Sequence, residues 1–342
     1  MEKKPTIKTI AEIAGVSHVA VSRALRGCSD ISAETTKRIR EIAQEIGYTP
    51  NANARNLSAK LSSTIGMIVP SLDETSAYNA LFNQISLAAA KRNYCVMLGS
   101  SHRSIELEGQ HCRMMVENRV GALIVSSCTS DVGHIKNICD GHVPVLYIGG
   151  KTDPKEPCAL FCDYYFSAVQ AVKYLYKLGH EHIAFFAYAP ENLTIRQKEK
   201  GFTDCMKTHN LTPRVYISGN ASNTLEAGGE ITQRLIEKNE LPTAIWCASD
   251  LMAIGVVQTL RKNGFLVPED VSVMGHDDLF FDIFPDINLT TLHTPFLEIG
   301  TAAADLAIDL TENKAKEENL RQVFRTSLVK RDTVAQPNIN KK

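Results

Sequence analysis

The chain has 342 residues, of which 44% are apolar and 22% charged, and its formal net charge is −1. Since an average domain has roughly 150 residues, this length predicts about two domains, and the composition excludes a disordered, collagen-like or coiled-coil protein. The longest apolar stretches, such as 183–187 and 244–247, are far below the roughly 18 residues that a membrane span needs. We expect no membrane partner, and the polar N-terminus lacks a secretory signal, so we expect the cytoplasm.

Cysteine usage and short motifs argue against cofactors, metals and catalysis. The nine cysteines are scattered, with no C-x-x-C and no Cys/His spacing typical of zinc. The segment 149–152, Gly-Gly-Lys-Thr, lacks the first glycine of a phosphate-binding loop, because Val145 stands there. No dinucleotide fingerprint or serine-hydrolase motif occurs either. We therefore expect reduced cysteines, no cofactor, no metal and no enzymatic activity.

Charge is distributed unevenly along the chain. Residues 1–61 contain ten Lys/Arg and six Asp/Glu, a net charge of +4, which leaves −5 for the remaining residues. A basic N-terminal module on an acidic body is typical of proteins that bind a polyanion such as DNA. By itself, this asymmetry is also compatible with ordinary variation in composition.

The first 48 residues predict three short helices. Thr6 precedes a helix over 7–14 that Gly15 ends, Ser17 opens a second over 18–25, and Ser32 opens a third over about 33–46. The first two helices are joined by the three-residue turn 15–17, which is the pattern of a helix-turn-helix. Leu25 is expected to face inward together with Val21. A tight pair of helices without any DNA-binding role would show a similar pattern.

A helix-turn-helix places the start of its second helix in the major groove of DNA. The side chains predicted to project outward there are Ser17, His18, Val19, Ser22 and Arg23. Arg23 is the best candidate for a guanine contact, because its guanidinium can donate two hydrogen bonds to that base.

Residues 49–62 form a polar segment rich in alanine and asparagine. It has too few apolar residues to be a stable helix alone, so we interpret it as a hinge helix that forms conditionally. Leu57 lies between Arg55 and Lys60, which suits an apolar wedge in a minor groove with phosphates on either side. Alternatively, Leu57 packs on Leu61 or on a partner.

These segments together carry a resemblance. The patterns T-I-K-x-I-A-x-x-A-G-V-S, V-S-R-x-L, I-S-x-x-T and G-Y-x-P-N-x-x-A-R-x-L, within residues 6–57, resemble the lactose/galactose repressor (LacI/GalR) family of bacterial transcription regulators. The resemblance implies a DNA-binding domain over 1–48 and a hinge over 49–62, in which leucines of two protomers open the central base step of the operator. It implies DNA contacts from Thr6, Ser17, His18, Val19, Ser22, Arg23, Asn51, Ala54 and Leu57.

The rest of the chain alternates short apolar runs with helical patterns, which predicts parallel sheets in two α/β lobes with a break near 160–163. It resembles the family's effector-binding core, which is similar to periplasmic sugar-binding proteins. The resemblance implies an effector-binding and dimerisation domain over 63–342. It divides this domain into an N-lobe of about 63–161 and 294–322 and a C-lobe of about 162–293 and 323–332.

Effector-binding residues are expected in the cleft between the lobes, at the carboxyl ends of strands. The candidates are Tyr78, Ser126, Lys198, Asp250 and Asp277. The carboxylates suit paired hydrogen bonds from sugar hydroxyls, whereas Lys198 replaces an arginine of the family and suits an anionic group of a sugar acid. The alternatives are helix capping for Asp250, Asp277 and Ser126, and a solvated helix face for Lys198.

We therefore predict a homodimeric transcription regulator, a repressor, that binds palindromic double-stranded operator DNA under the control of a carbohydrate or sugar-acid effector. The predicted fold is an all-α helix-turn-helix head followed by a two-lobed, parallel-sheet α/β body. The main alternative is a periplasmic-type solute-binding protein, which the body fits but the head and the missing signal peptide disfavour. A dimeric scaffold would not need the basic linker.

Overall fold

The computed structural model describes residues 5–25, 28, 30–48, 62–72, 77–149, 156–189, 192–219, 224–279 and 284–338. The chain divides into two compact units, residues 1–60 and 61–342. Among the residues described, no helix is both long enough and apolar enough to span a bilayer.

The N-terminal unit is a bundle of short helices, and its helices are those predicted from the sequence. They are α1 (Ile7–Ala14), α2 (His18–Leu25) and α3 (Ala33–Glu45). The Thr6 hydroxyl accepts a hydrogen bond from the Thr9 amide, and Gly15 ends α1 with a left-handed φ of 67°. Both features stabilise helix termini whose backbone groups lack intrahelical partners.

A small apolar core holds these helices together. Its buried residues are Ile10, Ala14, Val21, Ala24, Ile39, Ile42 and Ala43. Ala24 is fully buried, whereas Leu25 is only partly buried at the edge of the core. Leu25 packs against the core as expected, but from its edge, while Ala24 takes the fully buried position.

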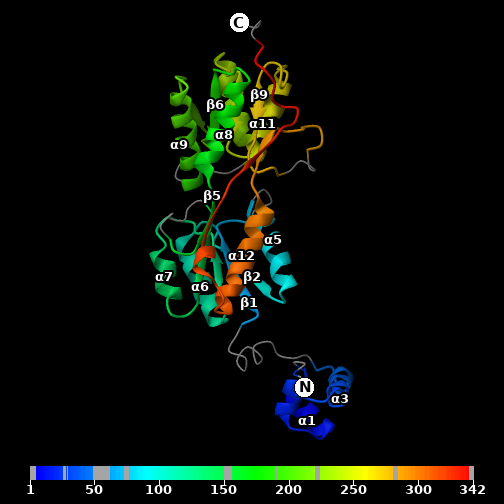
Figure 1. Cartoon of the computed structure of the whole chain (residues 1–342). Coiled ribbons are helices and arrows are strands. Elements are labelled where there is room, and N and C mark those ends of the chain that lie inside the picture. The colour runs from blue at the N-terminus through cyan, green and yellow to red at the C-terminus, as the bar shows by residue number, and fades with distance from the viewer. Residues whose placement is uncertain are drawn as a thin grey trace. The chain divides into compact units, whose positions relative to one another are not determined.

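The second unit has two α/β lobes, each built on a parallel sheet (Figure 1). The first sheet has the order β11-β5-β4-β3-β1-β2, and the second has the order β7-β6-β8-β9. The strands of the first sheet are β1 (Thr64–Val69), β2 (Cys95–Ser100), β3 (Leu123–Val125), β4 (Val145–Ile148), β5 (Ala159–Cys162) and β11 (Arg321–Phe324). The strands of the second are β6 (Ile183–Ala187), β7 (Arg214–Ile217), β8 (Ala244–Cys247) and β9 (Ser272–Met274).

Helices cover both faces of each sheet, as expected for parallel strands that are buried on both sides. In the first lobe these are α5 (Ala77–Lys91), α6 (Ile105–Glu117), α7 (Gly133–Cys139) and α12 (Phe296–Thr311). In the second they are α8 (Tyr164–Lys177), α9 (Leu193–Thr208), α10 (Leu225–Glu237) and α11 (Asp250–Lys262). Separate apolar clusters fill the space on each face.

The chain crosses between the lobes after β5, before α12 and after β11. A two-stranded antiparallel ribbon, β10 (Thr291–His293) with β12 (Ser327–Val329), belongs to this crossing region, and the short 3-10 turn η1 (Glu317–Asn319) precedes β11. The break predicted near 160–163 lies where the chain passes from the first lobe to the second, but residues 159–162 are themselves a strand, β5, which is paired on both sides within the first sheet. The chain leaves that sheet only at its end, where Asp163 caps α8.

Candidate functional sites

The outward face of α2 combines polar, basic and apolar groups. Ser17, His18 and Arg23 are exposed, Ser22 is half-buried, and Val19 is 52% exposed although it is apolar. The Ser17 hydroxyl accepts a hydrogen bond from the Ala20 amide at 3.2 Å, which holds the first turn of the helix. A helix start with exposed polar side chains and one exposed aliphatic side chain suits base edges and thymine methyl groups.

Arg23 has an acidic neighbour. Its Nη2 lies 2.7 Å from Oδ2 of Asp30, and the two side chains are 47% and 43% exposed. Thr6, by contrast, is engaged in capping α1, through a reciprocal pair of hydrogen bonds with Thr9. Asn51, Ala54 and Leu57, together with residues 49–61 of the expected hinge, lie outside the described part of the chain.

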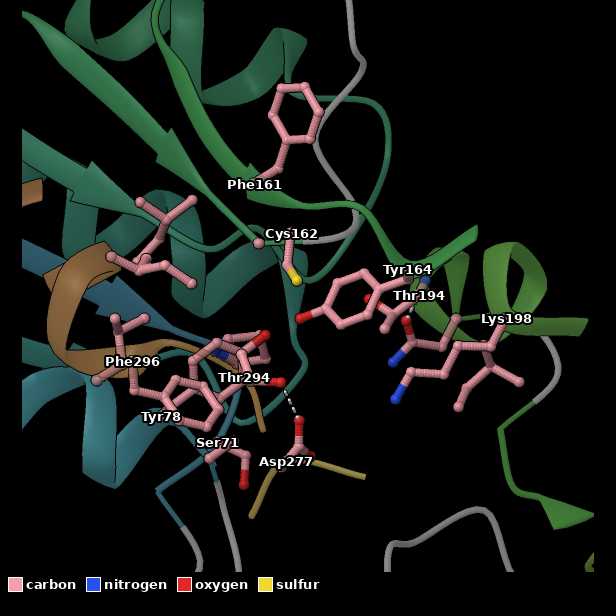
Figure 2. A pocket seen from close by; sticks show the side chains of 18 of the residues that line it. Ser71, Tyr78, Phe161, Cys162, Tyr164, Thr194, Lys198, Asp277, Thr294 and Phe296 are labelled. Atoms are coloured by element: carbon pink, nitrogen blue, oxygen red, sulfur yellow. Dashed lines mark hydrogen bonds between the residues drawn. The ribbon is translucent and has the colours of Figure 1, made fainter. Parts of the chain in front are cut away.

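A cavity of about 190 Å³ lies between the two lobes of the second unit (Figure 2). The first lobe contributes Tyr78 and Phe296, and the second contributes Tyr164, Lys198 and Asp277. Figure 2 shows Lys198 and Tyr164 pointing into the cavity from one side, with Tyr78 and Phe296 on the other. Such a combination of aromatic walls and a few polar groups is usual for small-molecule sites, and the volume lies below the usual range for drug-sized ligands of about 300 to 1,000 Å³.

Asp277 is positioned by its backbone and by Thr294. Its Oδ1 accepts a hydrogen bond from the Thr294 hydroxyl at 2.9 Å, and its amide donates to the Leu292 carbonyl at 2.8 Å. The residue has a φ of 106°, a conformation that is strained for a non-glycine residue and that recurs at functional sites. Burial raises the pKa of this carboxyl, while Lys198 and Thr294 oppose the rise.

Lys198 is a buried cation, 3% exposed, so the alternative of a solvated helix face does not hold for it. Its Nζ donates to the Ala248 carbonyl at 2.8 Å and lies 5.1 Å from the centre of the Tyr164 ring. Burial lowers its pKa to about 8, against the opposing effect of Asp277. The neighbouring basic residues Arg196 and Lys200 are exposed, so the basic cluster of the sequence divides between cavity and solvent.

Tyr78 and Ser126 act as a pair. The Ser126 hydroxyl donates to the Tyr78 hydroxyl oxygen at 2.9 Å, and Ser126 itself is buried behind the cavity wall. Gly149 lines the cavity beside them with a φ of 90°, and a Cβ there would lie 3.1 Å from Ser126 Oγ. Ser126 therefore orients Tyr78 and does not itself line the cavity.

Asp250 does not line the cavity. Its Oδ1 accepts from the Thr291 hydroxyl, and its Oδ2 accepts from the Leu279 amide at 2.6 Å. Helix α11 is capped by Ser249, so the predicted alternative of capping by Asp250 was also wrong. The carboxylate fixes the loop after β9 instead, and it packs so closely against Gly275 that a Cβ there would collide with its Oδ1.

Several cavity residues were not singled out from the sequence. They are Ser71, Arg103, Phe161, Cys162, Tyr164, Tyr188, Asn192, Thr194, Thr294 and Phe296, among others. Tyr164 follows β5 at the carboxyl edge of the parallel first sheet, the position that predicts ligand contacts in such folds, and Thr294 follows β10 of the antiparallel ribbon. Neither strand was recognised from the sequence. Within the described ranges, no cluster of three or more His, Cys, Asp or Glu side chains is suited to a metal ion.

Two family models match the chain. The model "Bacterial regulatory proteins, lacI family" matches residues 6–51, and the model "Periplasmic binding protein-like domain" matches residues 172–334. The first covers the helix-turn-helix, and the second begins within α8 and runs through the rest of the C-lobe, α12 and the strands β11 and β12. The chain belongs to the LacI family of bacterial regulatory proteins.

Curated LacI-family relatives align over nearly their full length. The HTH-type transcriptional regulator AscG of Escherichia coli (strain K12) is 28% identical over 97% of this chain and 99% of its own. The HTH-type transcriptional repressor CytR of the same strain is 29% identical over 90% of both chains. This LacI-family chain is accordingly a DNA-binding transcription regulator with an effector-binding domain, and not an enzyme.

A solved structure supports the same fold. The lac repressor dimer, bound to operator and the anti-inducer ONPF, superimposes with a TM-score of 0.87 at 26% identity, covering 97% of this chain and 100% of that chain. That homologue therefore binds DNA as a dimer while holding a small molecule. Both the predicted fold class and the predicted family are confirmed for this LacI-family member.

Proposed function

We propose that this protein is a homodimeric repressor that binds a palindromic operator and is controlled by a small carbohydrate or sugar acid held between its lobes. The observation that carries the proposal is the presence of both parts in one chain: an exposed helix-turn-helix face and a cavity between two lobes, lined by aromatic and a few polar side chains. A solute receptor would need only the second part.

Arg23 is the proposed guanine-reading residue, with His18 and Val19 reading neighbouring bases at the start of α2. Ser17 and Ser22 are proposed to contact phosphates, together with Thr6, Asn51 and Ala54. Phosphate contacts fix the register of the protein on DNA, and base contacts supply the specificity. Leu57 is proposed to wedge into the minor groove at the centre of the operator, where the two hinge segments of a dimer meet.

The effector is proposed to lie against Tyr78 and Tyr164, whose rings suit the apolar face of a sugar ring. Asp277 is proposed to accept hydrogen bonds from two hydroxyls of the effector. The hydrogen bond from Thr294 to one of its oxygens holds the carboxylate in place for these contacts. Lys198 is proposed to bind an oxygen-rich or anionic group as a point charge. The loop 220–223, outside the described residues, is not assigned a contact.

Effector binding is proposed to change the closure of the two lobes and thereby the ability of the hinges of a dimer to form helices. Such coupling is typically worth about 1 to 3 kcal/mol, which changes operator affinity by roughly 5- to 150-fold. The effector shifts this equilibrium only to the extent that it binds one lobe arrangement more tightly than the other.

The test is selection of bound duplexes from a random DNA pool at one fixed salt concentration, followed by a screen of sugars, sugar acids and nucleosides on the selected duplex. A palindrome of roughly 14 to 20 base pairs with a readily kinked central step is expected. If no sequence is enriched with or without the screened compounds, operator binding is overturned and the solute-receptor alternative is favoured.

A further inference from the structure

The pairing of Arg23 with Asp30 is a feature that operator binding, as proposed above, does not explain. DNA is a polyanion, so an aspartate beside the DNA-reading arginine repels phosphates. The two groups nevertheless lie 2.7 Å apart, on the face of α2 assigned to DNA. We propose that Asp30 is a positioning residue that sets the specificity of Arg23; this inference rests on the proposed operator binding.

The backbone places Asp30 precisely beside Arg23. The Cys28 amide donates to the Arg23 carbonyl at 3.1 Å, and the Ile31 amide donates to the Cys28 carbonyl at 3.4 Å. On the other side, the Ser32 hydroxyl accepts from the Thr35 amide and fixes the start of α3. The backbone of Asp30 thus lies between two hydrogen-bonded points, which keep it close to Arg23.

The pair leaves the arginine able to read DNA. A guanidinium has five N–H donors, and one carboxylate can accept at most two of them in a fork arrangement. The remaining donors suffice for the two acceptors on the edge of a guanine. Arg23 is also 47% exposed, so its free edge is open to an incoming duplex.

Asp30 changes the balance between specific and non-specific binding. The negative charge of Asp30 weakens the attraction of Arg23 to phosphates, which every DNA sequence presents alike. The hydrogen bonds to guanine persist, and the arginine that makes them is already held in one orientation. The carboxylate therefore lowers non-specific affinity more than specific affinity, and the ratio of the two rises.

The test compares wild type, Asp30→Asn and Glu12→Gln in full-length protein, by fluorescence anisotropy with the selected operator and with random-sequence DNA. Glu12 is an exposed acid of the same unit with no ion pair among the described residues, so its variant makes the same change in charge. Circular dichroism at the assay temperature verifies that each variant is folded.

Asp30→Asn is expected to raise non-specific affinity about two- to fivefold, to leave operator affinity equal or lower, and so to reduce the specificity ratio about two- to fivefold. The logarithmic salt dependence of non-specific binding should steepen by about one. Glu12→Gln should leave the ratio unchanged. Binding of Arg23→Ala to operators with single base substitutions identifies the base pair that Arg23 contacts. Asp30→Asn should show a relaxed base preference at that base pair only.

An equal gain on both DNAs, as expected for simple removal of charge, would overturn the inference. The same conclusion follows if Asp30→Asn lowers the ratio equally in an Arg23→Ala background, since the effect would then not pass through Arg23. These outcomes differ from failure of the proposed function, in which the wild-type protein itself enriches no operator.

Discussion

The helix-turn-helix unit and the cavity between the lobes each present a basic side chain, but in opposite environments. Arg23 is half-exposed and pairs with Asp30 at 2.7 Å, whereas Lys198 is buried and donates a hydrogen bond to the backbone carbonyl of Ala248. Salt and water screen the first charge, but the second acts in a medium of low dielectric. The same type of charge therefore suits transient contact with a polyanion in one region and selective contact with a small ligand in the other.

The two units also differ in the size of their cores. Among the described residues, seven are buried in the core of the helical unit, while the lobes bury apolar side chains on both faces of two sheets. Small domains bury a smaller fraction of their surface and are correspondingly less stable. We expect the helical unit to be the more easily unfolded of the two.

The largest expected effect follows from this difference. Ile39→Ala, in the core of the helical unit, should cost about 2 to 5 kcal/mol, which is most of the stability of so small a domain. Differential scanning calorimetry should show loss of its transition, and operator binding should disappear while effector binding is retained. Leu146→Ala, in the first lobe, is the matched control. It is expected to lower the transition temperature of the lobes and to leave that of the helical unit unchanged. Loss of effector binding in Ile39→Ala would contradict the expectation that the helical unit unfolds without unfolding the lobes.

The second prediction concerns the cavity. Asp277→Asn preserves size but removes a charged acceptor, so effector affinity should fall about 10- to 100-fold by isothermal titration calorimetry. Operator affinity without effector should change less than twofold. Asp204→Asn, a half-buried acid on α9 that does not line the cavity, is the control and should bind effector normally. Unchanged affinity in Asp277→Asn would remove this residue from the effector site.

The third prediction concerns the hinge. Leu57→Ala should weaken operator binding about tenfold or more, because loss of an intercalating side chain removes stabilisation of the kinked base step. Binding to random DNA should weaken much less, as measured by anisotropy at one salt concentration. Equal losses on both DNAs would contradict the wedge and favour simple packing of Leu57.

The smallest expected effect is a pH dependence. The pKa of Lys198 is lowered to about 8, so its ammonium form is present below that pH and is lost as pH rises through it. If the effector contacts the ammonium, its affinity should be constant from pH 6 to 7 and fall by up to about tenfold per pH unit above 8. Lys198→Arg remains protonated throughout and should remove this dependence. A decline that persists in Lys198→Arg would assign it to another group.

Local signals predicted the helical unit almost completely. Helix caps and terminators act on neighbours within four residues, so the sequence alone predicts their effects; here they are Thr6, Ser32 and Gly15. The buried strands β6 and β8 were likewise evident as the apolar runs 183–187 and 244–247. Strands β5, β7 and β10 to β12 were missed, because several are short or lie at sheet edges, where burial is incomplete.

The cavity required tertiary information. Tyr164, Thr294 and Phe296 come from segments far apart in the chain, and only the crossing between the lobes brings them together. Asp250 and Asp277 both lie next to strand ends in the sequence, yet Asp250 turns to the Leu279 amide while Asp277 faces the cavity. No local pattern separates these two aspartates.

The sequence by itself determined the family, the helix-turn-helix and the alternating α/β order, because capping, periodicity and motif spacing are properties of neighbouring residues. The tertiary structure alone decided which charges are buried and which are paired, including Lys198 in the cavity and Asp30 beside Arg23. The physical reason is that desolvation and ion pairing depend on distances between segments that the fold, not the chain order, brings together.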